Sequence, residues 1–188
     1  MIEKTGIRLI AIELLATPLF LKFKFLIIFL VVAIAFTAMF FRDPERKIHE
    51  GVISPADGKI DYLEGNRLEI FMRLFDCHIN RAPVDGIVRR IVFKKGSRPP
   101  AFIRSEKAMR NEIYIESEDG IFKVTQVAGI FARRIVCYVK EGDFVRKGQK
   151  IGMIRFGSRV ILEIPKGYRF VKDVGETVKA GETIAVKV

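Results

Sequence analysis

The sequence contains no tryptophan, only 2 histidines and only 2 cysteines. Two cysteines are too few for a disulfide framework, and the spacing of a zinc site is absent from the sequence. We therefore expect Cys77 and Cys137 to be reduced thiols, and we expect no metal centre. Cys77 precedes His78, but neighbouring residues on a strand point to opposite faces, so a small buried thiol is favoured over a Cys/His nucleophile pair.

Acidic residues are also in deficit, because 33 Lys and Arg face 22 Asp and Glu, which gives a net charge of +11 over 188 residues. This charge suits an anionic partner, either a nucleic acid or an acidic membrane surface. Most aromatic residues are Phe, and several lie in the apolar N-terminal region instead of alternating with basic residues. This pattern favours lipid over stacked bases, so we expect a membrane partner and no nucleic acid.

The longest run without a charge covers residues 25–41. Its length is at the lower limit of about 17 residues for a helix that crosses the hydrocarbon core. Residues 6–21 are also apolar but contain charges and a proline, so they make a poorer span. Basic residues flank the main run on both sides, which leaves three arrangements open: one span, a shallow re-entrant hairpin or an interfacial anchor. The run lacks a signal-peptide cleavage site, so we expect a retained helical membrane anchor over residues 1–41.

From residue 50 onward the helical signal nearly disappears. Short runs rich in β-branched residues alternate with Gly, Pro, Asp and Asn, which predicts an all-β sandwich or barrel. Only residues 100–110 favour a short helix. We therefore expect a mainly β catalytic domain over residues 42–188. The runs are 52–53, 59–63, 67–72, 86–93, 111–116, 121–127 and 134–139.

The C-terminal part of the chain repeats one pattern. Gly-x-x-Val-x-x-Gly-x-x-Ile occurs at residues 142–151 and again at 175–184. Each copy has the turns and the buried valine of a β-hairpin in a barrel-sandwich module such as the lipoyl and biotinyl domains. We therefore expect a barrel-sandwich-like domain with two glycine hairpins. Phe-Gly-Ser at 156–158 lies between the two copies.

Five short motifs are more specific together than any of them alone. They are Phe-Phe-Arg-Asp-Pro-Glu-Arg at 40–46, Ser-Pro-Ala-Asp-Gly at 54–58, Phe-Asp-Cys-His-Ile-Asn-Arg-Ala-Pro at 75–83, Gln-Val-Ala-Gly at 126–129 and Phe-Gly-Ser at 156–158. In this combination the chain resembles the phosphatidylserine decarboxylase family in its short, archaeal-type form. The resemblance implies a membrane-bound carboxy-lyase that faces the cytoplasm. Its substrate would be phosphatidylserine or the ether-lipid analogue archaetidylserine, and its products the ethanolamine phospholipid and CO2.

The resemblance also implies that the chain cuts itself between Gly157 and Ser158, into a long β chain (1–157) and a short α chain (158–188). Glycine tolerates the sharp turn that lets a serine hydroxyl attack the preceding carbonyl. Ser158 then becomes a pyruvoyl group, which forms a Schiff base with the substrate amine and acts as an electron sink. The implied assembly is a heterodimer of the two chains, with a dimer of heterodimers as an open alternative.

Two more site residues follow from the resemblance. His78 occupies the position of a family histidine that donates a proton in decarboxylation, and Asp57 belongs to an Asp-His-Ser triad for self-cleavage. Longer family members carry the triad histidine three residues after the first, where this sequence has Arg81. Two alternatives for the base stay open: His78 serves both steps, or turn strain suffices with help from Asp57.

Other classes of protein explain the motifs less well. A membrane-anchored, lipoyl-like carrier or adaptor without catalysis would need a modified lysine flanked by methionines, and it leaves Phe-Gly-Ser unexplained. A β-rich metallopeptidase would need more histidines than the chain has. Exposed arginines on the strands are candidates for contact with the lipid phosphate, with none singled out. They are Arg81, Arg89, Arg90, Arg133 and Arg134.

Overall fold

The computed structural model divides the chain into two compact units, Met1–Glu45 and Arg46–Val188, which we call the helical unit and the β unit. Each unit is described by itself. The residues that the structure describes are 3–20, 24–97, 99–100, 103–105, 107–129, 134–155 and 158–188.

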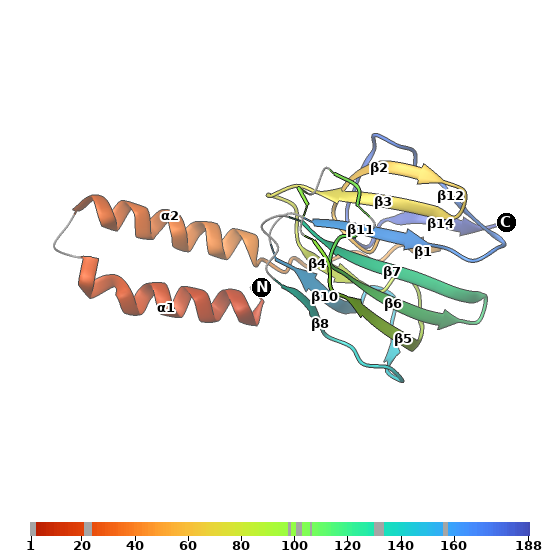
Figure 1. The fold of residues 1–188 in the computed structure, drawn as a ribbon, viewed down its shortest axis with the longest axis horizontal. Coiled ribbons are helices and arrows are strands. Elements are labelled where there is room, and N and C mark those ends of the chain that lie inside the picture. Colours follow the sequence, from red (N-terminus) through yellow and green to blue (C-terminus); the bar gives the residue numbers. More distant parts are fainter. Residues whose placement is uncertain are drawn as a thin grey trace. The chain divides into compact units, whose positions relative to one another are not determined.

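The helical unit consists of two 17-residue helices, α1 (Lys4–Phe20) and α2 (Lys24–Phe40), red and orange in Figure 1. The Thr37 hydroxyl on α2 donates a hydrogen bond to the Glu13 carboxylate on α1 (3.1 Å), which links the two helices. Among the described residues, neither helix combines the length and apolarity needed to cross a membrane. The anchor expected over residues 1–41 therefore has no support from helix length.

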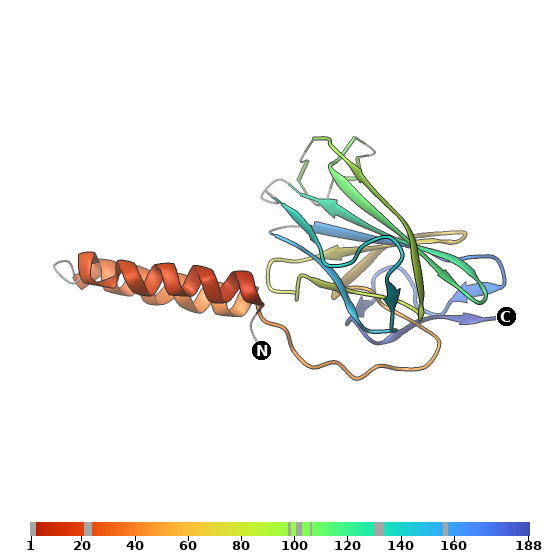
Figure 2. The same cartoon turned by 90° about the horizontal axis from the view of Figure 1, so that it is seen from below.

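The β unit confirms the expected mainly β fold, and its paired strands are all antiparallel. Eight strands form a large sheet in the order β13-β2-β3-β11-β7-β6-β5-β9, and two small sheets have the orders β1-β14-β12 and β4-β10-β8. Figure 2 shows how strongly the large sheet curls. The strands are β1 (Val52–Ile53), β2 (Gly58–Glu64), β3 (Arg67–Met72), β4 (Ile79–Arg81), β5 (Gly86–Lys94), β6 (Arg110–Ser117), β7 (Gly120–Ala128), β8 (Ile135–Cys137), β9 (Phe144–Val145), β10 (Lys150–Ile154), β11 (Ser158–Glu163), β12 (Tyr168–Phe170), β13 (Thr177–Val178) and β14 (Thr183–Lys187).

The hydrophobic core of the β unit lies on one face of the large sheet. Val160 and Leu162 on β11 pack there with Phe122 and Val124 from the neighbouring β7, and all four are fully buried. Because side chains alternate along a strand, Arg159 belongs to the opposite face, and it is buried as well. Both faces of the large sheet are therefore covered around β11.

The two glycine repeats occupy equivalent places, but they are not hairpins. In the first repeat, β9 pairs with β5 at one end of the large sheet, while β10 lies between β4 and β8. In the second, β13 pairs with β2 at the other end, while β14 lies between β1 and β12. Glycines 142, 148, 175 and 181 all have positive φ angles, which suit glycine at the turns between the arms. The expected turns are present, but the expected pairing is wrong, because the arms of each repeat join different sheets.

The short helix expected over residues 100–110 is absent from the described part of that segment. Residues 95–109, which we call the cover segment, leave β5 and return to β6, and a bridge between Ser97 and Ala108 closes them at the base. Ala108 and Met109 were two of the apolar residues that suggested a helix. Ala108 instead forms the bridge with Ser97, and Met109 N–H donates to the Ser97 carbonyl (2.8 Å), so pairing with a distant backbone replaces helical hydrogen bonds there.

Candidate active site

Three connections join the middle of the large sheet to the small sheet β4-β10-β8. β3 leads to β4 through residues 73–78, β7 leads to β8 through 129–134, and β10 leads to β11 through 155–157. The strand orders β3-β11-β7 and β4-β10-β8 match, so β11 and β10 are each the central strand of their trio. The connection that contains Gly157 therefore starts at the central strand of the small sheet and ends at the central strand of the trio in the large sheet. The other two connections run on either side of it.

Ser158 is the first residue of β11, and its backbone pairs with Met72 on β3 and with Ala128 on β7. On both sides the pairing continues to Glu163, so ladders of hydrogen bonds hold both edges of β11. Gly157, the other residue of the predicted cleavage site, lies outside the described residues. The predicted cut therefore falls where a loop enters a strand that is fixed on both sides.

His78 is the last residue of the connection between β3 and β4, and its side chain is fully buried. Its main-chain carbonyl accepts a hydrogen bond from Ile154 N–H at the end of β10 (3.2 Å). Its ring Nδ1 is 2.8 Å from the main-chain carbonyl of Asp76. A carbonyl can only accept, so Nδ1 carries a proton and Nε2 is the ring nitrogen that exchanges one. The fold thus orients a buried imidazole beside the β10–β11 connection.

Asp57 precedes β2, at the same end of the large sheet as Ser158. Lys59 pairs with Phe71, and Phe71 in turn pairs with Arg159, so β3 lies between β2 and β11. With neighbouring strands about 4.8 Å apart, the backbones of β2 and β11 are roughly 10 Å apart. The structure therefore gathers Asp57, His78 and the backbone of Ser158 at one end of the sheet.

The Asp57 carboxylate has two strong partners. One oxygen accepts a hydrogen bond from Arg46 Nη2 (2.6 Å), and the other accepts from Ala180 N–H (2.8 Å). Although burial opposes the charge of Arg46, the carboxylate of Asp57 raises the pKa of this guanidinium. The Asp57 carboxylate is thus paired with Arg46 in the uncut chain, and any part in self-cleavage starts from this ion pair.

Cys77 is a buried, reduced thiol, as the sequence predicted. Burial raises the pKa of the thiol, and the nearby Asp57 carboxylate acts in the same direction. A thiol with a raised pKa stays protonated at neutral pH and is a weak nucleophile. The buried thiol therefore agrees with the interpretation that was favoured over a Cys/His nucleophile pair.

A row of buried amides links the sheets near Ser158, and the sequence analysis missed it. Asn111 donates to Gln126 (3.0 Å), Gln126 donates to Asn80 (2.8 Å), and Asn80 donates to the Met72 sulfur (3.8 Å). A Cβ atom at Gly152 would come within 2.5 Å of Gln126 Nε2, so glycine allows β10 to pass close to this row. The signal was available, because Gln126 is a polar residue among inward-facing apolar ones on β7.

The arginines predicted to contact phosphate are spread over the β unit. Arg81 donates to the Gly148 carbonyl (2.9 Å), Arg89 pairs with Glu116, and Arg90 is exposed on β5. Arg134 lies at the site, because its main-chain carbonyl accepts a hydrogen bond from Arg155 N–H (3.3 Å), and Arg133 lies outside the described residues. In the part of the chain that the structure describes, no group of three or more His, Cys, Asp and Glu residues could hold a metal ion.

A different arginine is the second residue after the predicted cut. Arg159 donates to both oxygens of Asp61 (2.6 and 2.7 Å) and to Glu69 (2.7 Å). These two carboxylates come from β2 and β3, so Arg159 ties three strands together on the face opposite the core. These ion pairs fix the start of β11 through a side chain, in addition to the backbone hydrogen bonds on its two edges.

Comparison with known proteins agrees with the motifs. Residues 33–186 match the family model described as phosphatidylserine decarboxylase. A protein of Archaeoglobus fulgidus assigned as an archaetidylserine decarboxylase proenzyme is 64% identical over 100% of this chain and 96% of its own. A Methanococcoides burtonii protein with the same assigned name is 42% identical over 97% of this chain and 88% of its own.

A bacterial relative carries the other substrate name. The phosphatidylserine decarboxylase proenzyme of Syntrophus aciditrophicus is 40% identical and covers 87% of this chain and 85% of its own. The matched region includes all five motifs on which the resemblance was based. The resemblance is therefore confirmed, and the chain belongs to the phosphatidylserine decarboxylase family.

Proposed function

We propose that the chain is a proenzyme that cuts itself between Gly157 and Ser158 and then decarboxylates a serine phospholipid to the ethanolamine phospholipid. The observation that carries this proposal is the place of Ser158, at the start of a strand fixed on both edges and beside the connection that ends at the buried His78. The relatives are named for archaetidylserine and for phosphatidylserine, so the substrate class is a serine phospholipid with ether or ester tails. Family membership also disfavours a carrier or adaptor without catalysis.

Self-cleavage would begin with attack of the Ser158 hydroxyl on the Gly157 carbonyl, which turns the amide into an ester. Elimination then releases the new carboxylate of Gly157 and leaves a carbon–carbon double bond at residue 158. Addition of water and loss of ammonia complete a pyruvoyl group at the start of the α chain. The fold suits this group, because β11 would hold its carbonyl at the end of a fixed strand. When present, the group supplies the electron sink that decarboxylation needs.

The residues of this chain would supply position and protons. Asp76 holds Nδ1 of His78 through its main-chain carbonyl, so a protonated ring presents its acidic N–H at Nε2. We assign to His78 the proton that returns to the substrate carbon after CO2 leaves. Asp57 would assist self-cleavage after its ion pair with Arg46 rearranges, either together with His78 or by support of a strained turn at residue 157.

Mass measurement tests the proposal directly. Under denaturing conditions the purified protein should separate into chains 1–157 and 158–188. Under native conditions the two should stay together, because the α chain supplies β11 in the middle of the large sheet and β14 in the middle of a small one. The α chain should resist N-terminal sequencing and should react with phenylhydrazine, a carbonyl reagent. A single full-length mass in fully active protein would reject self-cleavage.

Replacement of His78 should separate the two chemical steps. His78→Ala should lower the decarboxylation rate of the processed protein by about 10²- to 10⁴-fold, the usual contribution of a positioned acid. His49→Ala is the matched control, because His49 is the other histidine and is exposed. Loss of the chain split in His78→Ala would assign the self-cleavage base to His78 as well. Normal turnover by His78→Ala would remove this residue from the mechanism.

We further propose that the helical unit holds the protein at the cytoplasmic face of the cell membrane. Leu15 on α1 and Phe29 on α2 are 80% and 71% exposed, an unusual load of apolar surface for water. The full-length protein should float with anionic phospholipid vesicles in a density gradient. The double variant Leu15→Asp, Phe29→Asp should lose vesicle binding and stay at the bottom of the gradient. Val188→Asp changes another exposed apolar residue and should still float. Equal flotation of both variants would contradict this role of the helices.

A further inference from the structure

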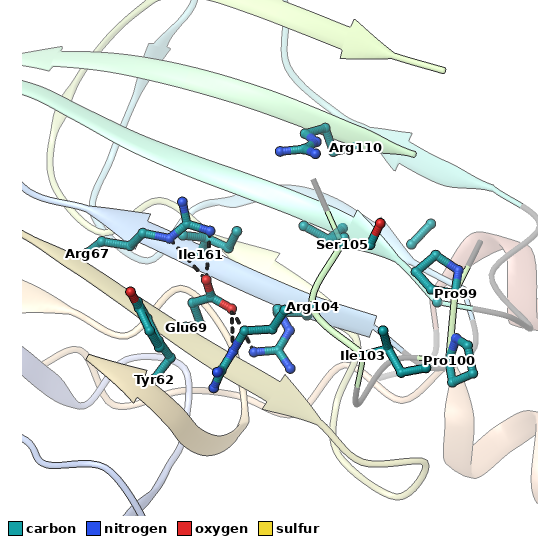
Figure 3. Close-up of a pocket in the computed structure, with 14 residues that line it drawn as sticks. Tyr62, Arg67, Glu69, Pro99, Pro100, Ile103, Arg104, Ser105, Arg110 and Ile161 are labelled. Atoms are coloured by element: carbon teal, nitrogen blue, oxygen red, sulfur yellow. Dashed lines mark hydrogen bonds and ion pairs between the residues drawn. The ribbon is translucent and has the colours of Figure 1, made fainter. Parts of the chain in front are cut away.

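A pocket of about 240 Å³ lies on the face of the large sheet opposite the core. Its floor comes from β2, β3, β11 and β7, and one wall is formed by residues of the cover segment, namely Pro99, Pro100, Ile103, Arg104 and Ser105 (Figure 3). We call it the arginine pocket, because Arg67, Arg104, Arg110 and Arg159 line it together with Glu69. Among the described residues that line it, Glu69 is the only carboxylate.

The arginine pocket contains more positive than negative groups. The Glu69 carboxylate forms ion pairs with Arg67 (2.7 Å) and Arg159 (2.7 Å), and the Arg104 guanidinium lies 3.6 Å from it. Asp61, which stands behind the pocket, also accepts from Arg159. Four guanidinium groups thus face two carboxylates, and this part of the pocket keeps an excess of positive charge.

Arg110 and Arg104 are the two guanidinium groups that the pocket offers to a ligand. Arg110 donates through Nε to the Ala108 carbonyl (3.3 Å), its one side-chain hydrogen bond within the described part of the chain, which leaves its terminal nitrogens. Arg104 donates through one terminal nitrogen to the Asp61 main-chain carbonyl and lies over the Tyr62 ring (4.6 Å to the ring centre). These contacts orient its planar group, and its side chain is 48% exposed. Two forked donors at a positive pocket suit the paired oxygens of a phosphate or phosphodiester.

The pocket also has apolar walls, and it ends beside the backbone of Ser158. Ile103 and the two prolines of the cover segment face Val127 and Ile161 of the sheet. At its end the pocket is lined by Ala128 and Gly129, and Ala128 is the backbone partner of Ser158. A ligand that fills this space would therefore place its polar headgroup near residue 158.

We infer that the arginine pocket binds the phosphodiester of the serine phospholipid. Arg104 and Arg110 contact its oxygens, and Arg159 supplies fixed positive charge from the floor. This inference rests on the proposed function, because it takes the substrate to be a serine phospholipid. It also gives a reason for a buried arginine as the second residue after the predicted cut: the same side chain that fixes β11 raises the electrostatic potential of the substrate pocket.

The test uses the full-length Ser158→Ala protein, which cannot process and therefore separates binding from catalysis. Equilibrium dialysis with glycerophosphoserine, the headgroup without its tails, should show binding that Arg110→Gln and Arg104→Gln each weaken by about 10-fold. Arg110→Lys should weaken binding less than Arg110→Gln does, because lysine keeps the positive charge although it lacks the two-pronged guanidinium geometry. Arg90→Gln is the matched control, an exposed arginine on β5 outside the pocket, and should bind normally.

Several outcomes would overturn the inference. Unchanged binding in Arg110→Gln and Arg104→Gln would do so, and so would an equal loss in Arg90→Gln. Inorganic phosphate that binds as tightly as glycerophosphoserine would show a general anion site instead of a headgroup site. In processing-competent protein, Arg110→Gln should raise KM for the phospholipid about 10-fold with little change in kcat. If unsubstituted protein neither splits nor decarboxylates, the proposed function fails, while the dialysis result still decides what the pocket binds.

Discussion

The Ser158→Ala protein should be recovered as one unbroken chain of 21.5 kDa and should show no decarboxylation. Alanine has no hydroxyl to attack the Gly157 carbonyl, so neither the ester nor the pyruvoyl group can form. The loss should be complete within detection, because the residue supplies both the nucleophile for the cut and the atoms of the cofactor. Intact-mass measurement and release of labelled CO2 from a serine phospholipid give the two readouts.

The chain contains a matched control for this experiment. A second Gly-Ser-Arg tripeptide occupies residues 96–98, in the cover segment. There Ser97 is exposed and forms an isolated bridge with Ala108, without strands on both edges and without a histidine beside it. Ser97→Ala should therefore be cut into two chains and should decarboxylate the phospholipid at the same rate as the parent protein. A split that survives in Ser158→Ala, or one that disappears in Ser97→Ala, would place the chemistry at another bond.

Arg159→Leu should destabilise the β unit by about 3–5 kcal/mol, the usual effect of removing one partner from a buried ion pair. Its guanidinium is only 5% exposed, and its loss would leave Glu69, 3% exposed, without its buried partner and Asp61 without its bidentate one. Denaturant unfolding should be measured in the Ser158→Ala background, where the protein stays a single chain and a two-state analysis applies.

An exposed arginine gives the comparison for Arg159. Arg169 on β12 is exposed, so Arg169→Leu should change the free energy of unfolding by no more than about 0.5 kcal/mol. If Arg159→Leu behaved like Arg169→Leu, the ion pairs of Arg159 would contribute nothing to the start of β11. A partial loss of self-cleavage in Arg159→Leu is expected as a second effect, because β11 holds residue 158.

Local patterns in the sequence predicted much of the site. Alternation and turn residues located most strands, and the motifs placed His78, Asp57 and Ser158 in one site before any geometry was known. The structure brings these residues to one region, because Asp57 and Ser158 lie at the same end of the large sheet and His78 precedes β4 in the small sheet that the three connections join to that end. Their chemical roles remain predictions, which the variants described above test.

Long-range pairing could not be predicted in the same way. The glycine repeats suggested hairpins because local turn chemistry does not state which strand each arm will join. The arginine pocket was missed for a related reason: its arginines come from β3, β6, β11 and the cover segment, and only the strand order brings them together. The amide row joins β6, β7, β4 and β3, so no single stretch of sequence reveals it.

The matched order of the two strand trios has a consequence for the proposed cut. If the bond before residue 158 breaks, one new terminus belongs to β10 in a small sheet and the other to β11 in the large sheet, and each stays paired with its own neighbours. The fold would therefore survive the cut. The proposed chemistry would be irreversible for a separate reason: loss of ammonia removes the amine that religation would need.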